Sequence, residues 1–259
     1  MPSGPASARA SAEPRHYAFI HIPRTGGSTI WHALALLSKD VEIPIVDLYH
    51  DAKRKFNNSS KTVEALVDIQ KFLRANTCLI HHHVASKIDS FFDRKLQYAT
   101  VVRDPIDRFL SEINHVKHFV QTGMDNNIDI GWDESLLKLA CSPSVPIETL
   151  VHQAKSSPYF QDYYRRWFGA ILLGRDGNDC TTSIQDIWDP RFPTYVRQAF
   201  SYIGNFQHLE RVLLDISRSF GLPEPSIAIG HINKAKQSFS TAFNRNEYVA
   251  YFERDYAFL

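Results

Sequence analysis

The sequence is poor in the features that mark secreted, membrane and nucleic-acid-binding proteins. Its 259 residues include only three cysteines, Cys78, Cys141 and Cys180, and no CxxC pair, which disfavours a disulfide framework or a zinc knuckle. Lys and Arg total 29 against 28 Asp and Glu, so no global basic field favours DNA or RNA. No window approaches the roughly 20 apolar residues that span a bilayer. We therefore expect a cytoplasmic protein with free thiols, no membrane span and no nucleic-acid partner.

What is present is the composition of a globular protein. Hydrophobic residues make up 44% of the chain and aromatic residues 12%, enough to bury a sizeable core. Residues 1–15 are small, polar and proline-rich, and they lack the apolar stretch of a signal peptide. We expect a disordered tail over residues 1–15 and a single domain over residues 16–259.

Short apolar runs alternate with segments of helical periodicity. Strands are expected at 17–22, 43–49, 77–83 and 97–103, and helices at 24–39, 61–75, 86–92 and 104–120. The alternation predicts an α/β fold with a central parallel sheet flanked by helices, in which ligands bind at the carboxyl ends of the strands. The chain beyond Asn126 is mostly helical in pattern, with helices expected at 132–141, 147–154, 159–173, 189–201 and 208–221 and a further strand at 202–206.

The segment HIPRTGGST joins the first expected strand to the first expected helix, where phosphate-binding loops sit. Gly26 and Gly27 let the backbone approach an anion closely, and Arg24 adds a full positive charge. Ser28 and Thr29 add hydroxyl donors at the start of the helix. A plain glycine-rich turn is the alternative, and the gathering of these residue types at one junction makes it less favoured.

The loop differs from a Walker A sequence, because its basic residue precedes the glycines instead of following them. An NTPase or kinase also needs a carboxylate that holds Mg²⁺ near the phosphates. No predicted buried strand ends in such a residue, and Asp47 is the nearest candidate. A kinase that uses Mg-ATP is therefore the weaker interpretation of this loop.

A second basic motif follows the strand expected at 97–103. The strand ends in Arg103, Asp104 and Pro105 open a helix, and Ser111 lies two helical turns further on. An arginine and a hydroxyl in this arrangement can grip one phosphate from two sides. Arg108 has two interpretations: a second basic group of the site, or a solvated partner of Asp104 or Asp107.

Three consecutive histidines, His81, His82 and His83, end the strand before this motif. The two-residue period of a strand places His81 and His83 on one face and His82 on the other. A histidine titrates in the range that suits a general base. A metal site and a purely packing role are the alternatives; neighbouring strand residues cannot all face one ion, and no Cys, Asp or Glu stands nearby at ligand spacing. We therefore expect no metal.

Together these motifs resemble those of sulfotransferases that use 3′-phosphoadenosine 5′-phosphosulfate (PAPS). HIPRTGGST is similar to their 5′-phosphosulfate loop and VVRDPIDRFLSEINH to their 3′-phosphate strand and helix. The likeness is greatest to the carbohydrate group that contains the heparan sulfate 2-O- and 6-O-sulfotransferases, and to related bacterial enzymes. It extends to YIGNFQHLERVLLDISRSFG and to HINKAKQSF, and so covers residues 17–259.

The resemblance implies a P-loop NTPase-like sulfotransferase fold, PAPS as donor, PAP as product and no catalytic metal. The residues that would bind the 5′-phosphosulfate are Arg24, Thr25, Gly26, Gly27, Ser28 and Thr29. Arg103 and Ser111 would bind the 3′-phosphate, and Lys234 and Lys236 would close over the nucleotide. Arg24 stands where the family usually has Lys, which keeps the charge but changes its geometry.

The resemblance also bears on the histidines. In the heparan sulfate 2-O group a pattern HxHV precedes the 3′-phosphate motif, which assigns the base to His83 with His81 as its helper. A looser register in the wider family selects His82 instead. The implied reaction is sulfuryl transfer to a hydroxyl of a saccharide, glycolipid or small metabolite. A Mg-ATP kinase and a noncatalytic nucleotide-binding protein are the alternatives.

Overall fold

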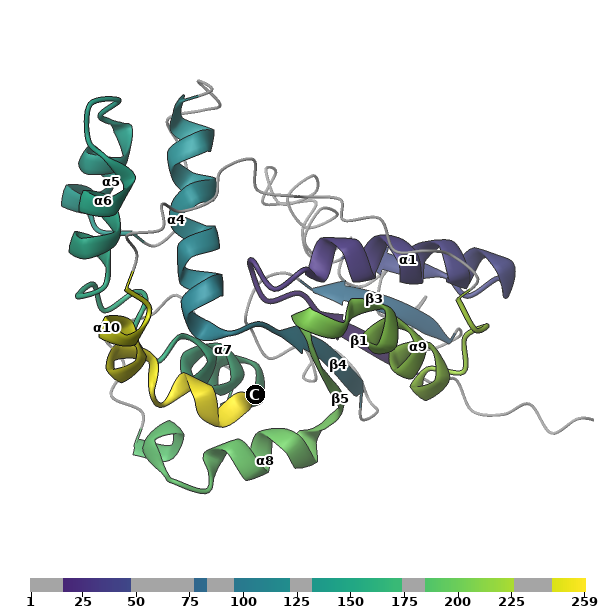
Figure 1. Ribbon diagram of the computed structural model, residues 1–259. Helices are drawn as coiled ribbons and strands as arrows, with labels where there is room; N and C mark the ends of the chain where they lie inside the picture. The colour runs from purple at the N-terminus through teal and green to yellow at the C-terminus, as the bar shows by residue number, and fades with distance from the viewer. Residues whose placement is uncertain (1–15, 48–76, 83–95, 122–131, 174–184, 226–243) are drawn as a thin grey trace, which may run out of the picture.

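A five-stranded sheet forms the centre of the fold (Figure 1). The computed structural model describes residues 16–47, 77–82, 96–121, 132–173, 185–225 and 244–259. The tail expected over residues 1–15 and the helices expected at 61–75 and 86–92 lie outside these ranges.

The strands lie in the order β2-β3-β1-β4-β5, and every neighbouring pair is parallel. Their bounds are β1 His16–Ile20, β2 Ile45–Asp47, β3 Cys78–His82, β4 Gln97–Val102 and β5 Phe200–Asn205. The described side chains of the inner strands β1, β3 and β4 are almost all buried, as is typical of parallel strands covered on both faces. The predicted α/β fold with a central parallel sheet is confirmed.

Helices cover both faces of this sheet (Figure 1). One face carries α1 (Gly27–Asp40) and α9 (Leu209–Ser219); the other carries α4 (Pro105–Gln121), α7 (Tyr163–Leu173) and α8 (Phe192–Ala199). Helices α5 (Glu134–Cys141) and α6 (Ile147–Ala154) pack on α4. The short elements are η2 (Gln185–Trp188), η3 (Phe206–His208), α10 (Asn246–Val249), η4 (Ala250–Phe252) and η5 (Asp255–Phe258). Over the described ranges, no helix combines the length and apolarity needed to cross a membrane.

Alternate strand residues divide the core between the two faces. Phe19, Leu79 and Val101 pack with α1 and α9, whereas Ile20 and Ile80 pack with the helices of the other face. Helix α1 meets the sheet through an apolar stripe at helical spacing, Ile30, Ala33, Leu34 and Leu37. The two-residue period of the strands and the 3.6-residue period of the helices thus determine which side chains enter the core on each face of the sheet.

The chain leaves β1 and β4 toward opposite faces of the sheet. After β1 it enters α1 on one side, and after the neighbouring strand β4 it enters α4 on the other. Open α/β sheets commonly bind their ligands at such a topological switch point, outside the carboxyl ends of the strands. Both basic motifs of the sequence therefore reach the same edge of the sheet.

The first strand and helix are shorter than the sequence pattern indicates. Strand β1 ends at Ile20 instead of residue 22, and α1 begins at Gly27 instead of residue 24. Arg24 and Gly26 have φ angles of 67° and 83°, in the left-handed region that a right-handed helix cannot include. The residues between strand and helix form a separate turn.

Helix α7 begins at Tyr163, later than the expected start at residue 159, because the C-terminal segment caps it there. The carboxylate of Asp255 accepts the backbone N–H groups of Tyr163 and Tyr164, each at 2.9 Å. Burial raises the pKa of Asp255 to about 6, and the two hydrogen bonds oppose that shift. A residue far along the chain thus satisfies the first amides of a buried helix.

Replacing Asp255 by Ala should lower the free energy of unfolding by about 2–3 kcal/mol, because two buried N–H groups lose their acceptor. Urea denaturation followed by circular dichroism measures the change. Glu253→Ala, an exposed carboxylate of the same segment, is the matched control and should cost less than about 0.5 kcal/mol. Equal losses in the two variants would contradict the capping role.

Candidate functional site

The turn after β1 is held in shape by its own backbone and side chains. The Thr25 hydroxyl donates to the Ile22 carbonyl at 2.8 Å, and the residue is completely buried. The Gly26 carbonyl accepts the N–H groups of Thr29 and Ile30 at 3.1 and 3.3 Å, which starts α1. The Thr25 hydroxyl therefore shapes the loop, and the amino end of α1 is presented at the carboxyl edge of the sheet.

An aromatic side chain from the end of β5 closes against this turn. A Cβ atom at Gly26 would lie 2.6 Å from a ring carbon of Phe206, so glycine is required here both for its φ angle and for space. The guanidinium of Arg103 also lies over the Phe206 ring, 4.4 Å from its centroid. Phe206 thus bridges the two basic motifs.

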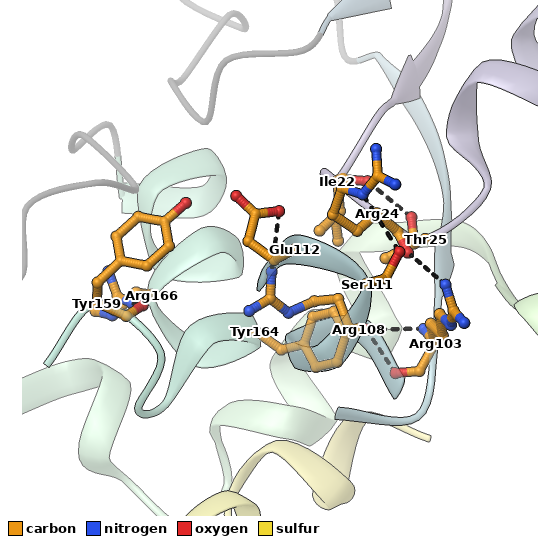
Figure 2. A network of polar contacts seen from close by, with 10 residues as sticks. All are labelled: Ile22, Arg24, Thr25, Arg103, Arg108, Ser111, Glu112, Tyr159, Tyr164 and Arg166. Atoms are coloured by element: carbon orange, nitrogen blue, oxygen red, sulfur yellow. Dashed lines mark hydrogen bonds and ion pairs between the residues drawn. The ribbon is translucent and has the colours of Figure 1, made fainter. Parts of the chain in front are cut away.

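Three residues predicted to bind anions come together at the carboxyl edge of the sheet (Figure 2). Arg24 donates from Nε to the Ser111 hydroxyl at 3.3 Å, and Arg103 donates from Nη1 to the Arg24 carbonyl at 3.4 Å. These contacts join the turn after β1, the end of β4 and the second turn of α4. The loop and the helix that the sequence assigns to the two ends of one ligand are therefore adjacent.

The backbone of Arg103 is fixed by Tyr164 of α7. The Tyr164 hydroxyl accepts the Arg103 N–H at 2.8 Å and donates to the Arg103 carbonyl at 2.5 Å. Burial raises the pKa of Tyr164 well above its ordinary value, so the phenol keeps the proton that it donates. The position of Arg103 thus depends on a helix outside both motifs.

Arg108 is a member of the buried network, and its interpretation as a solvated partner of Asp104 or Asp107 is wrong. Its side chain is 1% exposed, and its guanidinium lies 3.4 Å from the centroid of the Tyr163 ring. Nη1 of Arg108 is 4.0 Å from Oε2 of Glu112, one helical turn further along α4 (Figure 2). Burial by α7 outweighs the helix-surface pairing that the sequence spacing suggested.

Asp104 and Asp107 pair with Arg245 from the C-terminal segment instead. Arg245 contacts the Asp104 carboxylate and lies 2.6 Å from Oδ1 of Asp107. Asp104 also accepts the N–H groups of Ile106 and Asp107 at 3.0 and 3.1 Å, as an N-cap ahead of Pro105. The predicted start of this helix is confirmed.

Positive charge dominates around Arg24 at this edge of the sheet. Burial lowers the pKa of Arg24, with smaller contributions of the same sign from Arg103 and Arg108, while Glu112 opposes them. Glu112 is itself 5% exposed, and its burial raises its pKa although Arg108 and Arg24 favour the carboxylate. Closely spaced guanidinium groups beside a helix N-terminus favour a polyanionic ligand.

Of the three consecutive histidines, His81 is the one whose side chain the structure describes, and it is buried near the same edge of the sheet. His81 of β3 is 4% exposed, and its Nε2 lies 3.3 Å from Nδ1 of His21, the first residue after β1. Its ring stacks on Trp31 of α1 with 4.4 Å between centroids. His82 is the last residue of β3. His83, Lys234 and Lys236 lie outside the described ranges, so their roles remain predictions.

Sequence reasoning missed three parts of this site. Phe206, Tyr164 and the contact of His21 with His81 all depend on residues that are distant in sequence, such as the 61 positions between Arg103 and Tyr164. The segment YIGNFQHLE carried a signal for Phe206, because it belongs to the motifs quoted above. No local pattern marks Tyr164.

The fold and the site define an α/β protein with two basic motifs at a topological switch point. Residues 11–131, a little under half of the chain, match the sulfotransferase family. The matched stretch contains the turn after β1, β3, β4 and α4. No curated protein matches the chain. The family match supports a sulfotransferase, an enzyme of sulfuryl transfer, and the fold fits the P-loop-like fold of that family.

Replacing Tyr164 by Phe should lower the free energy of unfolding by about 1–3 kcal/mol, because the backbone N–H and carbonyl of Arg103 lose their partner. Chemical denaturation measures the loss. Tyr195→Phe removes the hydroxyl of an exposed tyrosine in α8 and should be nearly neutral. If Tyr164→Phe were as stable as that control, the hydroxyl would not hold Arg103 in place.

Proposed function

We propose that this protein transfers a sulfuryl group from PAPS to a hydroxyl of a saccharide, glycolipid or small metabolite. The observation that carries the proposal is the meeting of Arg24, Arg103 and Ser111 at one end of the sheet, inside a stretch that matches the sulfotransferase family. PAPS carries a phosphate at the 3′ position of its ribose and a phosphosulfate at the 5′ position. Two basic motifs in contact suit such a donor.

The donor binds across the carboxyl ends of β1 and β4 in this proposal. Its 5′-phosphosulfate lies at the amino end of α1, held by Arg24, the amides of Gly26 to Ser28, and the Ser28 hydroxyl. Its 3′-phosphate lies at Arg103 and Ser111. Lys234 and Lys236 close over the nucleotide. Nε of Arg24 and the hydroxyl oxygen of Ser111 are only 3.3 Å apart, which supports the binding of both charged groups of one donor molecule at this site.

The transfer step needs a base and a group that stabilises the leaving phosphate. The acceptor oxygen attacks sulfur while its O–H bond breaks and the proton passes to His83, with His81 as helper. The bond from sulfur to the 5′-phosphate oxygen breaks, and its electron pair leaves with PAP. Arg24 and the loop amides stabilise the charge that develops on that oxygen. The buried position of His81 at the end of β3 supports a histidine base at this edge.

PAP should stabilise the protein without Mg²⁺, raising the melting temperature by about 5 °C or more at 100-fold excess over Kd. Arg103→Ala should weaken PAP binding by about 10–100-fold, because one charge-assisted contact is lost, and should barely change binding of 5′-AMP, which lacks the 3′-phosphate. Arg211→Ala, an exposed arginine of α9, is the control and should leave PAP binding unchanged. Thermal shift and calorimetry give both values.

A preference for Mg-ATP over PAP would overturn the donor assignment in favour of a kinase. Binding of PAP without transfer to any hydroxyl acceptor in a saccharide and metabolite panel would instead indicate a noncatalytic nucleotide-binding protein.

His83→Ala should reduce sulfuryl transfer from radiolabelled PAPS by about 10²-fold or more, the usual contribution of a general base, while PAP affinity stays within about twofold. His82→Ala is the matched control from the same triplet. A larger loss of turnover in His82→Ala than in His83→Ala would move the base to His82.

A further inference from the structure

His21, the first residue after β1, contacts His81 of β3. His21 and His81 are 7% and 4% exposed, and their ring nitrogens Nδ1 and Nε2 are 3.3 Å apart. Their ring centroids lie 5.4 Å apart at an interplanar angle of 32°. The contact joins the end of β1 to the end of β3, two strands that are paired in the sheet.

The His21 ring also touches the glycine turn. A Cβ atom at Gly27 would lie 2.0 Å from Cδ2 of His21 and 2.7 Å from its Nε2. Real side chains never approach so closely, so the imidazole occupies the space directly against the first residue of α1. A shift of Gly27 when an anion binds to the loop must therefore move the His21 ring or be resisted by it.

The His81 ring has little freedom to turn away from this contact. Trp31 stacks on it at 4.4 Å with an interplanar angle of 10°, and Phe19 lies 6.4 Å away at 12°. The plane of the His81 ring is therefore set by aromatic neighbours on α1 and β1. What the packing does not set is which ring nitrogen carries the proton.

A hydrogen bond between two imidazole nitrogens needs one N–H and one lone pair. A neutral histidine carries its proton on either Nδ1 or Nε2, so the choice on one ring of the pair dictates the choice on the other. Partners of this kind commonly fix the tautomer of functional histidines. The contact therefore couples the tautomers of the two rings, so that an environment that fixes the tautomer of His21 also fixes that of His81.

We propose that His21 is a positioning residue for sulfuryl transfer, which holds His81 in a single tautomer and connects it to the phosphate loop at Gly27. The inference rests on the proposed function, because His81 acts there as helper to the base. A helper whose proton sits on a fixed atom presents the same donor or acceptor at every turnover. In this role His21 acts through His81 and Gly27.

Histidine tautomers can be measured without any ligand. In full-length protein with ¹⁵N-labelled histidine, long-range ¹H–¹⁵N spectra distinguish Nδ1–H from Nε2–H, and single substitutions assign the signals. His21→Phe keeps a ring against Gly27 but removes Nδ1. His21→Asn keeps a polar atom near the position of Nδ1. His32→Phe changes an exposed histidine of α1 and serves as the control.

We expect one dominant His81 tautomer in the wild-type protein and in His32→Phe, and a mixture or the opposite tautomer in His21→Phe. His21→Asn should restore the wild-type signals at least in part. In the transfer assay, His21→Phe should lower kcat by about tenfold or more with PAP affinity within about twofold, the scale on which partners of functional histidines act. His21→Asn should recover most of that loss.

An unchanged His81 tautomer in folded His21→Phe would overturn the inference, even if kcat fell, because His21 would then act through packing alone. If His21→Phe does not fold, the reciprocal variant His81→Asn reports on the His21 tautomer and decides the same question. Failure of the wild-type protein to bind PAP would overturn the proposed function and this role with it. The tautomer measurement needs no PAP, so the two failures are distinguishable.

Discussion

The crowding of like charge at the carboxyl edge of the sheet is the constraint on which this structure depends. Arg103 and Arg108 lie close enough to Arg24 to disfavour its charged form, and the carboxylate of Glu112 opposes both of these interactions. Guanidinium groups cannot escape this repulsion by losing a proton under ordinary conditions. The fold must therefore hold each of them by contacts that offset the repulsion.

Different contacts hold each of the three. Arg108 is enclosed by Tyr163 and Glu112, Arg103 is held through its backbone by Tyr164 and through its side chain by Phe206, and Arg24 is held by Ser111. Hydrogen bonds from arginine to neutral oxygens offset only part of the cost of burying the charge. In the proposed function, the two phosphates of the donor would offset the remaining cost.

The sequence predicted the fold well where local chemistry decides it. Apolar strand runs, the Gly26-Gly27 turn and the Asp104-Pro105 helix start each carry their own physical signal, and each appears where expected to within a few residues. Arg108 shows where such reasoning stops. Its spacing suits a surface ion pair, yet α7 covers it, and nothing local to α4 encodes the arrival of Tyr163. The His21–His81 contact, 60 residues apart in sequence, is hidden for the same reason.

The charges and the residues that orient them come from different parts of the chain. Arg24, Arg103 and Ser111 lie inside the stretch that matches the sulfotransferase family, whereas Tyr164, Phe206 and the C-terminal segment lie outside it. That segment acts on the site twice: Arg245 pairs with the two aspartates that open α4, and Asp255 caps the helix that bears Tyr164.

Both sets of contacts act on the backbone around Arg103. Tyr164 binds its N–H and carbonyl groups, and Asp104 is the next residue in the chain. A motif match alone thus supplies the chemistry of an anion site but not its geometry. The second half of this chain contributes to the geometry through the contacts of Tyr164 and Phe206 with Arg103. Differences in donor affinity between proteins that share the motifs should therefore follow from residues that contact the ends of β4 and α4 from outside the motifs.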